Sequence, residues 1–175
     1  MKRLMFCALL PIVWVLAHGS VLADNYVAGM SSNTDVALTT DTSWTVIRWV
    51  VVTISHVGAH SCVVNASADV ENPKGTTSKY LFDVTHNSGS TGSPGPGGNT
   101  GSERRLEFVD NPTIDDPDSL PVSTTKSWSG LTSNNGWGVS NNLHYFYFLG
   151  RKDNPTDLDT NVADGNITVI CVDTP

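Results

Sequence analysis

The sequence is poor in charge, and above all in basic residues. Charged residues make up 15% of its 175 residues, against about a quarter in ordinary globular proteins. Lysine and arginine number 10 and aspartate and glutamate 17, so the formal net charge is −7. Nucleic-acid binding needs a basic surface that displaces counterions, and anionic lipid attracts basic segments. The charge therefore argues against a nucleic-acid partner and against adsorption to anionic membranes.

Helical periodicity and familiar catalytic motifs are missing as well. No stretch repeats apolar residues every 3.6 positions over three turns, which argues against a helical fold. The sequence contains neither a Gly-x-Ser-x-Gly elbow nor an HExxH motif. We therefore predict that the protein is not an enzyme. A small hydrolase that uses paired carboxylates is the alternative.

Only one long apolar run is present, and it lies at the start of the chain. Two basic residues precede the run 4–17, and small or moderate side chains lead up to Ala23. This order is typical of a secretory signal peptide. The run has 14 residues, fewer than the ~20 that a membrane-spanning helix needs. We predict a signal peptide over 1–23 that is cleaved, an extracellular or periplasmic location, and no membrane insertion of the remaining chain.

Cysteine is scarce, which simplifies its pairing. Of three cysteines, Cys7 lies in the predicted signal peptide, so the exported chain keeps Cys62 and Cys171. Exported proteins commonly join such a pair, and two thiols are too few for a zinc site. The sequence therefore predicts a Cys62–Cys171 disulfide. In the chain-entropy model, a cross-link that closes a loop of this length stabilises the folded state by about 4–5 kcal/mol.

Strand signals are dense in the remaining chain. Runs rich in β-branched and aromatic residues predict about eight strands, at 35–40, 44–54, 61–70, 78–85, 103–109, 119–128, 142–150 and 166–172. The segment 87–102 consists only of Gly, Ser, Pro, Asn and Thr, which predicts a flexible surface loop. We expect a single all-β domain over 24–175, an antiparallel β-sandwich. The favoured topology is a jelly roll, and the alternative is an immunoglobulin-like sandwich.

One predicted strand, 143–149, is apolar on both of its faces. A sheet with one wet face should alternate apolar and polar residues, and an exposed apolar patch usually marks an interface. Either a loop or a second subunit is expected to cover this strand. We predict self-association through its aromatic residues, which are Tyr145, Phe146, Tyr147 and Phe148.

The aromatic run 144–148 is followed by a closing strand, Ile167-Thr168-Val169-Ile170. This succession resembles the jelly rolls of the C1q/tumour-necrosis-factor-like group, over about the last third of the chain. The resemblance implies a trimeric recognition module without catalytic activity. The chain also resembles small secreted bacterial proteins, which implies no particular function.

Carboxylates gather in two predicted loops. One of them carries Asp110, Asp115, Asp116 and Asp118. Calcium binds six to eight oxygen ligands, and carboxylates on loops supply them. These four residues are therefore the candidate calcium ligands, and calcium is the only cofactor that the sequence suggests. The second acidic loop, 153–165, begins like an EF-hand but lacks its glycine and its glutamate. The alternative for both loops is that aspartate forms turns.

Two tryptophans flank a polar stretch. Trp128 and Trp137 enclose 129–136, which is rich in Ser, Asn and Gly. Aromatic rings with polar neighbours stack on sugars, so these two residues are the candidate ligand-binding residues. Packing at a strand end is the alternative. The sequence thus predicts a secreted, non-enzymatic binding or structural module that oligomerises and whose ligand is a carbohydrate or a protein. The alternatives are a carbohydrate-binding module and a small hydrolase.

Overall fold

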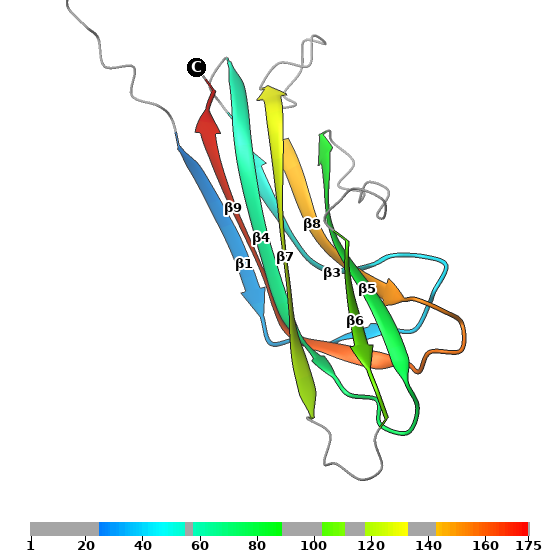
Figure 1. Ribbon diagram of the computed structural model, residues 1–175. Coiled ribbons are helices and arrows are strands. Elements are labelled where there is room, and N and C mark those ends of the chain that lie inside the picture. Colours follow the sequence, from blue (N-terminus) through cyan, green and yellow to red (C-terminus); the bar gives the residue numbers. More distant parts are fainter. Residues whose placement is uncertain (1–24, 55–57, 89–102, 111–117, 133–142, 175) are drawn as a thin grey trace, which may run out of the picture.

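The computed structural model describes residues 25–54, 58–88, 103–110, 118–132 and 143–174. These residues form two antiparallel sheets that pack face to face (Figure 1), and no helix occurs among them. No helix in this part of the chain is therefore long and apolar enough to cross a membrane. The strands are β1 (Tyr26–Ser32), β2 (Val36–Leu38), β3 (Thr45–Thr53), β4 (Ala59–Glu71), β5 (Ser78–Ser88), β6 (Arg104–Phe108), β7 (Ser119–Thr132), β8 (Leu143–Lys152) and β9 (Thr160–Asp173).

The order of the strands is that of a jelly roll. One sheet has the order β1-β9-β4-β7, with the short β2 also pairing with β9. The other sheet has the order β3-β8-β5-β6. The first and last strands therefore lie side by side, and the chain crosses between the sheets repeatedly. The predicted β-sandwich is confirmed, with the jelly-roll arrangement rather than the immunoglobulin-like one.

Alternating side chains place the core between the two sheets. In β4, residues Cys62, Val64, Ala66, Ala68 and Val70 are buried, and the residues between them face outward. Successive side chains of a strand point to opposite faces, so this alternation buries one face of the sheet. The aromatic part of the core comes from the other sheet, and it consists of Tyr80, Phe82, Phe108, Phe146 and Phe148.

Several strand boundaries differ from those that the sequence predicts. The segment 24–34 lacks an alternating apolar pattern, yet it contains β1, which pairs with β9 along its whole length. An edge strand takes its backbone hydrogen bonds from a neighbour, so a weak pattern suffices. The predicted loop 153–165 is also shorter than expected, because β9 begins at Thr160. A bulge interrupts β9 at Asp164, which has a φ of 47°. The predicted loop 87–102 starts late as well, since β5 continues to Ser88; the rest of that loop is outside the described residues.

A buried arginine ties the edge of the sandwich together. Arg48 of β3 is only 5% exposed, and its guanidinium donates to four backbone carbonyls. Nε donates to Gly165 at 3.0 Å, Nη1 to Ile47 at 2.6 Å, and Nη2 to Ser32 at 2.5 Å and Thr34 at 2.7 Å. One side chain therefore links β3 to the bulge of β9 and to the turn after β1. Buried cations need such partners, because desolvation otherwise destabilises them.

Candidate functional site

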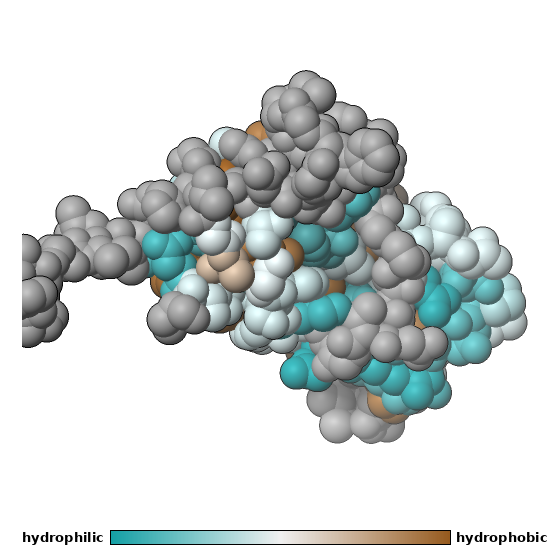
Figure 2. All heavy atoms as spheres, turned by 90° about the horizontal axis from the view of Figure 1, so that it is seen from above, coloured by the Kyte–Doolittle hydropathy of each residue, from teal (hydrophilic) through white to brown (hydrophobic). Residues whose placement is uncertain are grey.

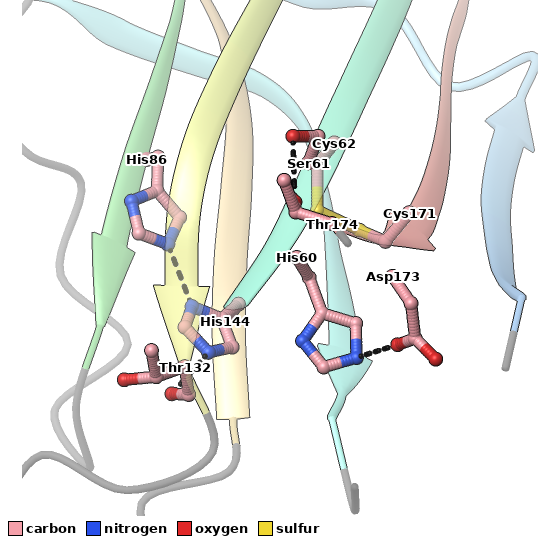
Figure 3. Close-up of a disulfide and its surroundings, with 9 residues drawn as sticks. All are labelled: His60, Ser61, Cys62, His86, Thr132, His144, Cys171, Asp173 and Thr174. Atoms are coloured by element: carbon pink, nitrogen blue, oxygen red, sulfur yellow. Dashed lines mark hydrogen bonds and ion pairs between the residues drawn. A yellow bond between two sulfur atoms is a disulfide. The ribbon is translucent and has the colours of Figure 1, made fainter. Parts of the chain in front are cut away.

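The predicted disulfide is present at one end of the sandwich. Cys62 of β4 and Cys171 of β9 are bonded to each other, and both are fully buried. They are also direct cross-strand partners in the register of these two strands. The disulfide therefore joins two neighbouring strands of one sheet (Figure 3). It does not connect the two sheets to each other.

Three histidines meet beside the disulfide, and we call them the histidine cluster. They are His60 of β4, His86 of β5 and His144 of β8, so both sheets contribute. The imidazoles of His86 and His144 stack with centroids 5.2 Å apart, and Nε2 of His86 lies 3.0 Å from Nδ1 of His144. His60 and His144 are 0% and 1% exposed. Figure 3 shows the three rings between strands of the two sheets.

The hydrogen bonds of the cluster determine which ring nitrogens carry protons. Nε2 of His144 faces the carbonyl oxygen of Thr132 at 3.3 Å. A carbonyl only accepts, so His144 carries its proton on Nε2 and offers Nδ1 as an acceptor. Nε2 of His86 must then donate to that Nδ1. Both rings are neutral in this arrangement.

Burial keeps these two histidines neutral. Desolvation lowers the pKa of His86 to about 4, and the neighbouring His144 adds to this effect. Desolvation also lowers the pKa of His144, against the opposing hydrogen bond to Thr132. Desolvation and a neighbouring imidazole both disfavour the charged imidazolium. His60 instead places Nε2 2.6 Å from Oδ1 of Asp173.

Trp128, a predicted sugar-binding residue, packs against this cluster. Its ring lies edge-on to Phe146 at 5.4 Å and 6.0 Å from His86, and the ammonium of Lys126 lies 5.0 Å above it. Trp128 is therefore a half-buried extension of the core, which corresponds to the packing alternative. Its predicted partner, Trp137, lies outside the described residues.

The aromatic strand does not offer the surface that its sequence suggests. Phe146 and Phe148 are fully buried in the core between the sheets, and Tyr147 is 2% exposed. A partner subunit has no access to these three side chains. Tyr145 alone is partly exposed, and its ring lies 6.1 Å from that of Trp49, which is 43% exposed. Among the described residues of β3 and β8, Trp49 and Tyr145 therefore form the exposed aromatic surface.

The candidate calcium ligands are only partly described. Asp110 and Asp118 are exposed, and the carboxylate of Asp118 pairs with the Lys74 ammonium at 3.1 Å. Asp115 and Asp116 lie outside the described residues. Within the described ranges, no three or more His, Cys, Asp or Glu side chains are grouped as metal ligands. Calcium binding by the loop 110–118 stays a prediction.

The second acidic loop uses its aspartates within the protein. The carboxylate of Asp157 accepts a hydrogen bond from the backbone N–H of Asn154 at 2.7 Å. Asp159 pairs with the ammonium of Lys152 at 2.9 Å, and Asp153 with the guanidinium of Arg105 at 2.5 Å. Asp157 therefore acts as a turn former, as the alternative proposed.

The outer face of the five-stranded sheet carries a broad surface without charge, which we call the uncharged face. Its side chains are short and are polar or aliphatic. Along the strand registers they are Val27, Gly29 and Ser31 of β1, Asn166, Thr168, Ile170 and Val172 of β9, Ser61, Val63, Asn65 and Ser67 of β4, and Ser123, Thr125 and Ser127 of β7. Farther along β4, the same outer face carries Asp69 and Glu71.

The uncharged face combines exposed aliphatic residues with ordered polar ones. Val27, Ile170 and Val63 form one cross-strand row and are 69%, 44% and 41% exposed. The polar side chains nearby are held by hydrogen bonds: Thr125 Oγ1 donates to Asn65 Oδ1 at 2.7 Å, and Asn166 Nδ2 to Ser67 Oγ at 2.9 Å. Open depressions lie over these polar rows. A partner would therefore meet a flat surface whose polar groups are already oriented.

The sequence alone does not predict the uncharged face or the histidine cluster. The alternation in 61–70 marks which residues of β4 face outward, and none of Ser61, Val63, Asn65 and Ser67 is charged. That signal was present, but the matching rows on β1, β7 and β9 depend on register. The three histidines are far apart in sequence, and only the pairing of strands brings them together.

No protein-family model and no curated protein matches this sequence.

Proposed function

We propose that the protein is an exported, non-enzymatic module that self-associates, with two copies stacking their uncharged faces. The observation that carries this proposal is the lack of charge over four adjacent strands of an acidic protein. The buried disulfide supports export, because such bonds persist in oxidising compartments. Contact between identical surfaces gives a closed, two-fold dimer.

Electrostatics favours this surface over the others. The chain carries a net charge of −7, and two copies therefore repel each other wherever acidic side chains face one another. On the uncharged face, contact brings no like charges together. Interface cores are also depleted of charged residues, which agrees with this assignment.

Geometry sets the expected strength of the contact. Four strands spaced ~4.8 Å apart, with six residue steps of ~3.4 Å, give a face of about 19 by 20 Å. This flat area of about 400 Å² is roughly half of the ~800 Å² that each partner buries in a standard interface. Short side chains allow the two sheets to approach to the usual ~10 Å. We therefore expect a weak dimer, with a dissociation constant in the micromolar range.

Analytical ultracentrifugation of the oxidised, exported protein between about 5 and 500 µM tests this prediction. The wild type should shift from monomer to dimer, and Val63→Lys should weaken dimerisation at least tenfold, because it places a charge in the central row. Val109→Lys is the matched control: Val109 is 62% exposed and lies after β6, away from the uncharged face. This control should dimerise like the wild type.

The salt dependence adds a second readout. Raising sodium chloride from 20 to 300 mM should strengthen the dimer, because salt screens repulsion between the remaining acidic surfaces. A protein that stays monomeric at 500 µM contradicts the proposal. An oligomer, including a trimer, that Val63→Lys leaves intact contradicts it as well, since another surface then makes the contact.

Carbohydrate binding is the second candidate function, and Trp49 favours it. Its exposed ring and that of Tyr145 lie on the outer face of the four-stranded sheet, opposite the uncharged face. Exposed aromatic rings stack on the apolar faces of sugars. Stacking of two sandwiches through their uncharged faces would leave both aromatic pairs accessible.

Titration calorimetry with cellohexaose and chitohexaose tests the carbohydrate-binding function. Binding should occur at millimolar ligand or below and should be lost in Trp49→Ala. Trp128→Phe should bind like the wild type, because Trp128 packs against the core. Absence of binding by both oligosaccharides, or binding that Trp49→Ala leaves unchanged, would contradict this function.

A further inference from the structure

The histidine cluster is a contact between the two sheets at the disulfide end. His60 belongs to β4 of the five-stranded sheet, whereas His86 and His144 belong to β5 and β8 of the other. His144 also reaches the carbonyl of Thr132 on β7, across the interior of the sandwich. Since the disulfide lies within one sheet, these contacts rather than the covalent bond help to hold the sheets together here.

The hydrogen bond between His86 and His144 tolerates only limited protonation. In the neutral pair, Nε2–H of His86 donates to Nδ1 of His144. A second proton on each ring places an N–H group on both sides of this 3.0 Å contact. The bond is then lost, and two positive charges lie next to each other in a buried site. Like charges at such a distance repel strongly where water does not screen them.

Other charged and titratable groups around the cluster come from three further strands. Asp173 of β9 pairs with His60, and the ring of Tyr26 of β1 lies edge-on to His60 at 5.5 Å. Lys126 of β7 lies over Trp128, and Trp128 contacts His86. The ammonium of Lys126 adds positive charge on the side of His86. The carboxylate of Asp173 contacts His60, on the other side of the cluster.

We propose that the histidine cluster is a proton-sensitive contact that closes the disulfide end of the sandwich at neutral pH and opens it in acid. Opening separates β5 and β8 from β4 and β7 at this end, while the disulfide keeps β4 and β9 joined. It uncovers Phe146 and Trp128, the aromatic residues packed beside the cluster. Figure 2 looks onto this end, and the described residues that are visible in this view are mostly hydrophilic or near neutral.

The direction of the pH dependence follows from the pKa of His86, which burial lowers to about 4. An unfolded histidine has a pKa of about 6.5, so the open state binds the proton first as the pH falls. The free-energy difference that favours the closed state is fully present above pH 6.5, and it is lost progressively between pH 6.5 and about 4. For His86 alone, this difference shifts the equilibrium by up to about 300-fold. The lowered pKa of His144 acts in the same direction.

Hydrogen–deuterium exchange of the intact, oxidised protein at pH 7.5, 6 and 4.5 tests the proposal. After correction for the intrinsic pH dependence of exchange, amides of 84–87, 126–131 and 143–146 should lose at least tenfold protection at pH 4.5. Amides of 78–82 and 104–108, at the opposite end of the four-stranded sheet, are the internal control. Their protection should change much less.

Variants identify the titrating groups. His86→Gln and His144→Gln keep polar side chains of similar size but carry no titrating group. In the double variant, amide protection at pH 4.5 should no longer differ between the two ends of the sandwich in its response to acid. Carbon-bound ring protons of the wild type, followed by NMR, supply an independent readout that needs no variant, and His86 should titrate well below pH 6.

Two outcomes overturn the proposal. One is an equal change in protection at both ends of the sandwich between pH 7.5 and 4.5. The other is titration of both His86 and His144 near pH 6.5, which would mean that the closed and open states bind protons equally. A difference between the ends that persists in the double variant assigns the acid response to other groups and equally overturns it.

Discussion

Loss of the Cys62–Cys171 disulfide is expected to lower the free energy of unfolding by about 4–5 kcal/mol. The two cysteines are 109 positions apart in sequence, and cross-linking such a long loop removes much of the conformational entropy of the unfolded chain. A domain of this size is typically stable by only about 5–15 kcal/mol. The double variant Cys62→Ala, Cys171→Ala should therefore unfold at a much lower urea concentration than the wild type.

Reduction of the wild type provides the matched control for this prediction. Reduced protein keeps both sulfur atoms in the core but lacks the cross-link. It therefore distinguishes the stability contributed by the cross-link from the stability lost when buried side-chain volume is removed. Urea unfolding of the oxidised, reduced and double-alanine forms measures each contribution. If the reduced form unfolds at the same urea concentration as the oxidised form, the cross-link does not stabilise this fold and the prediction is wrong.

Replacement of Arg48 by methionine is expected to destabilise the protein by about 3–4 kcal/mol. Methionine keeps much of the aliphatic length but removes every donor to the carbonyls of Gly165, Ser32 and Thr34. Hydrogen bonds from charged groups contribute about 1.5–3 kcal/mol each. Part of this loss is offset, because the variant no longer has to remove a guanidinium from water. The part of the fold most affected should be the junction of β1, β3 and the β9 bulge.

Arg151→Met is the matched control for Arg48→Met. Arg151 is half-buried, stacks on Trp44 and donates to the backbone of Asp41. Its replacement should cost only about 1 kcal/mol, since it bonds one carbonyl instead of several and does so at a half-buried site, where water weakens charged contacts. If urea unfolding shows equal destabilisation by the two variants, Arg48 stabilises the fold only through the packing of its aliphatic part and not through its hydrogen bonds. Arg48→Lys should fall between the wild type and Arg48→Met, because one ammonium cannot reach all the carbonyls.

Much of the fold was predictable because the period of two is a local property of the chain. Segments such as 61–70 and 78–85 alternate clearly and coincide with β4 and β5. The exception, β1, is an edge strand without a clear alternation of apolar and polar residues. Its position comes from pairing with β9, which a local pattern does not record.

The candidate sites were harder to predict, because residue type does not reveal which face a residue occupies. Trp49 and Trp128 have the same chemistry, yet Trp49 is exposed on an outer face and Trp128 packs beside the core. Because the strand is apolar on both faces, the sequence predicts that Phe146 and Phe148 form an exposed interface. Their burial follows from the opposing sheet, which supplies the other half of the core.

By itself, the sequence determined the fold class, most strand positions and the cysteine pairing. These depend on local alternation and on the presence of just two cysteines outside the predicted signal peptide. The tertiary structure decided which outer face is free of charge and which histidines meet. Both depend on strand register and on sheet packing, which join residues as far apart in sequence as Val27 and Ile170. Such contacts are set by the free energy of the whole sandwich, so no single segment of the sequence encodes them.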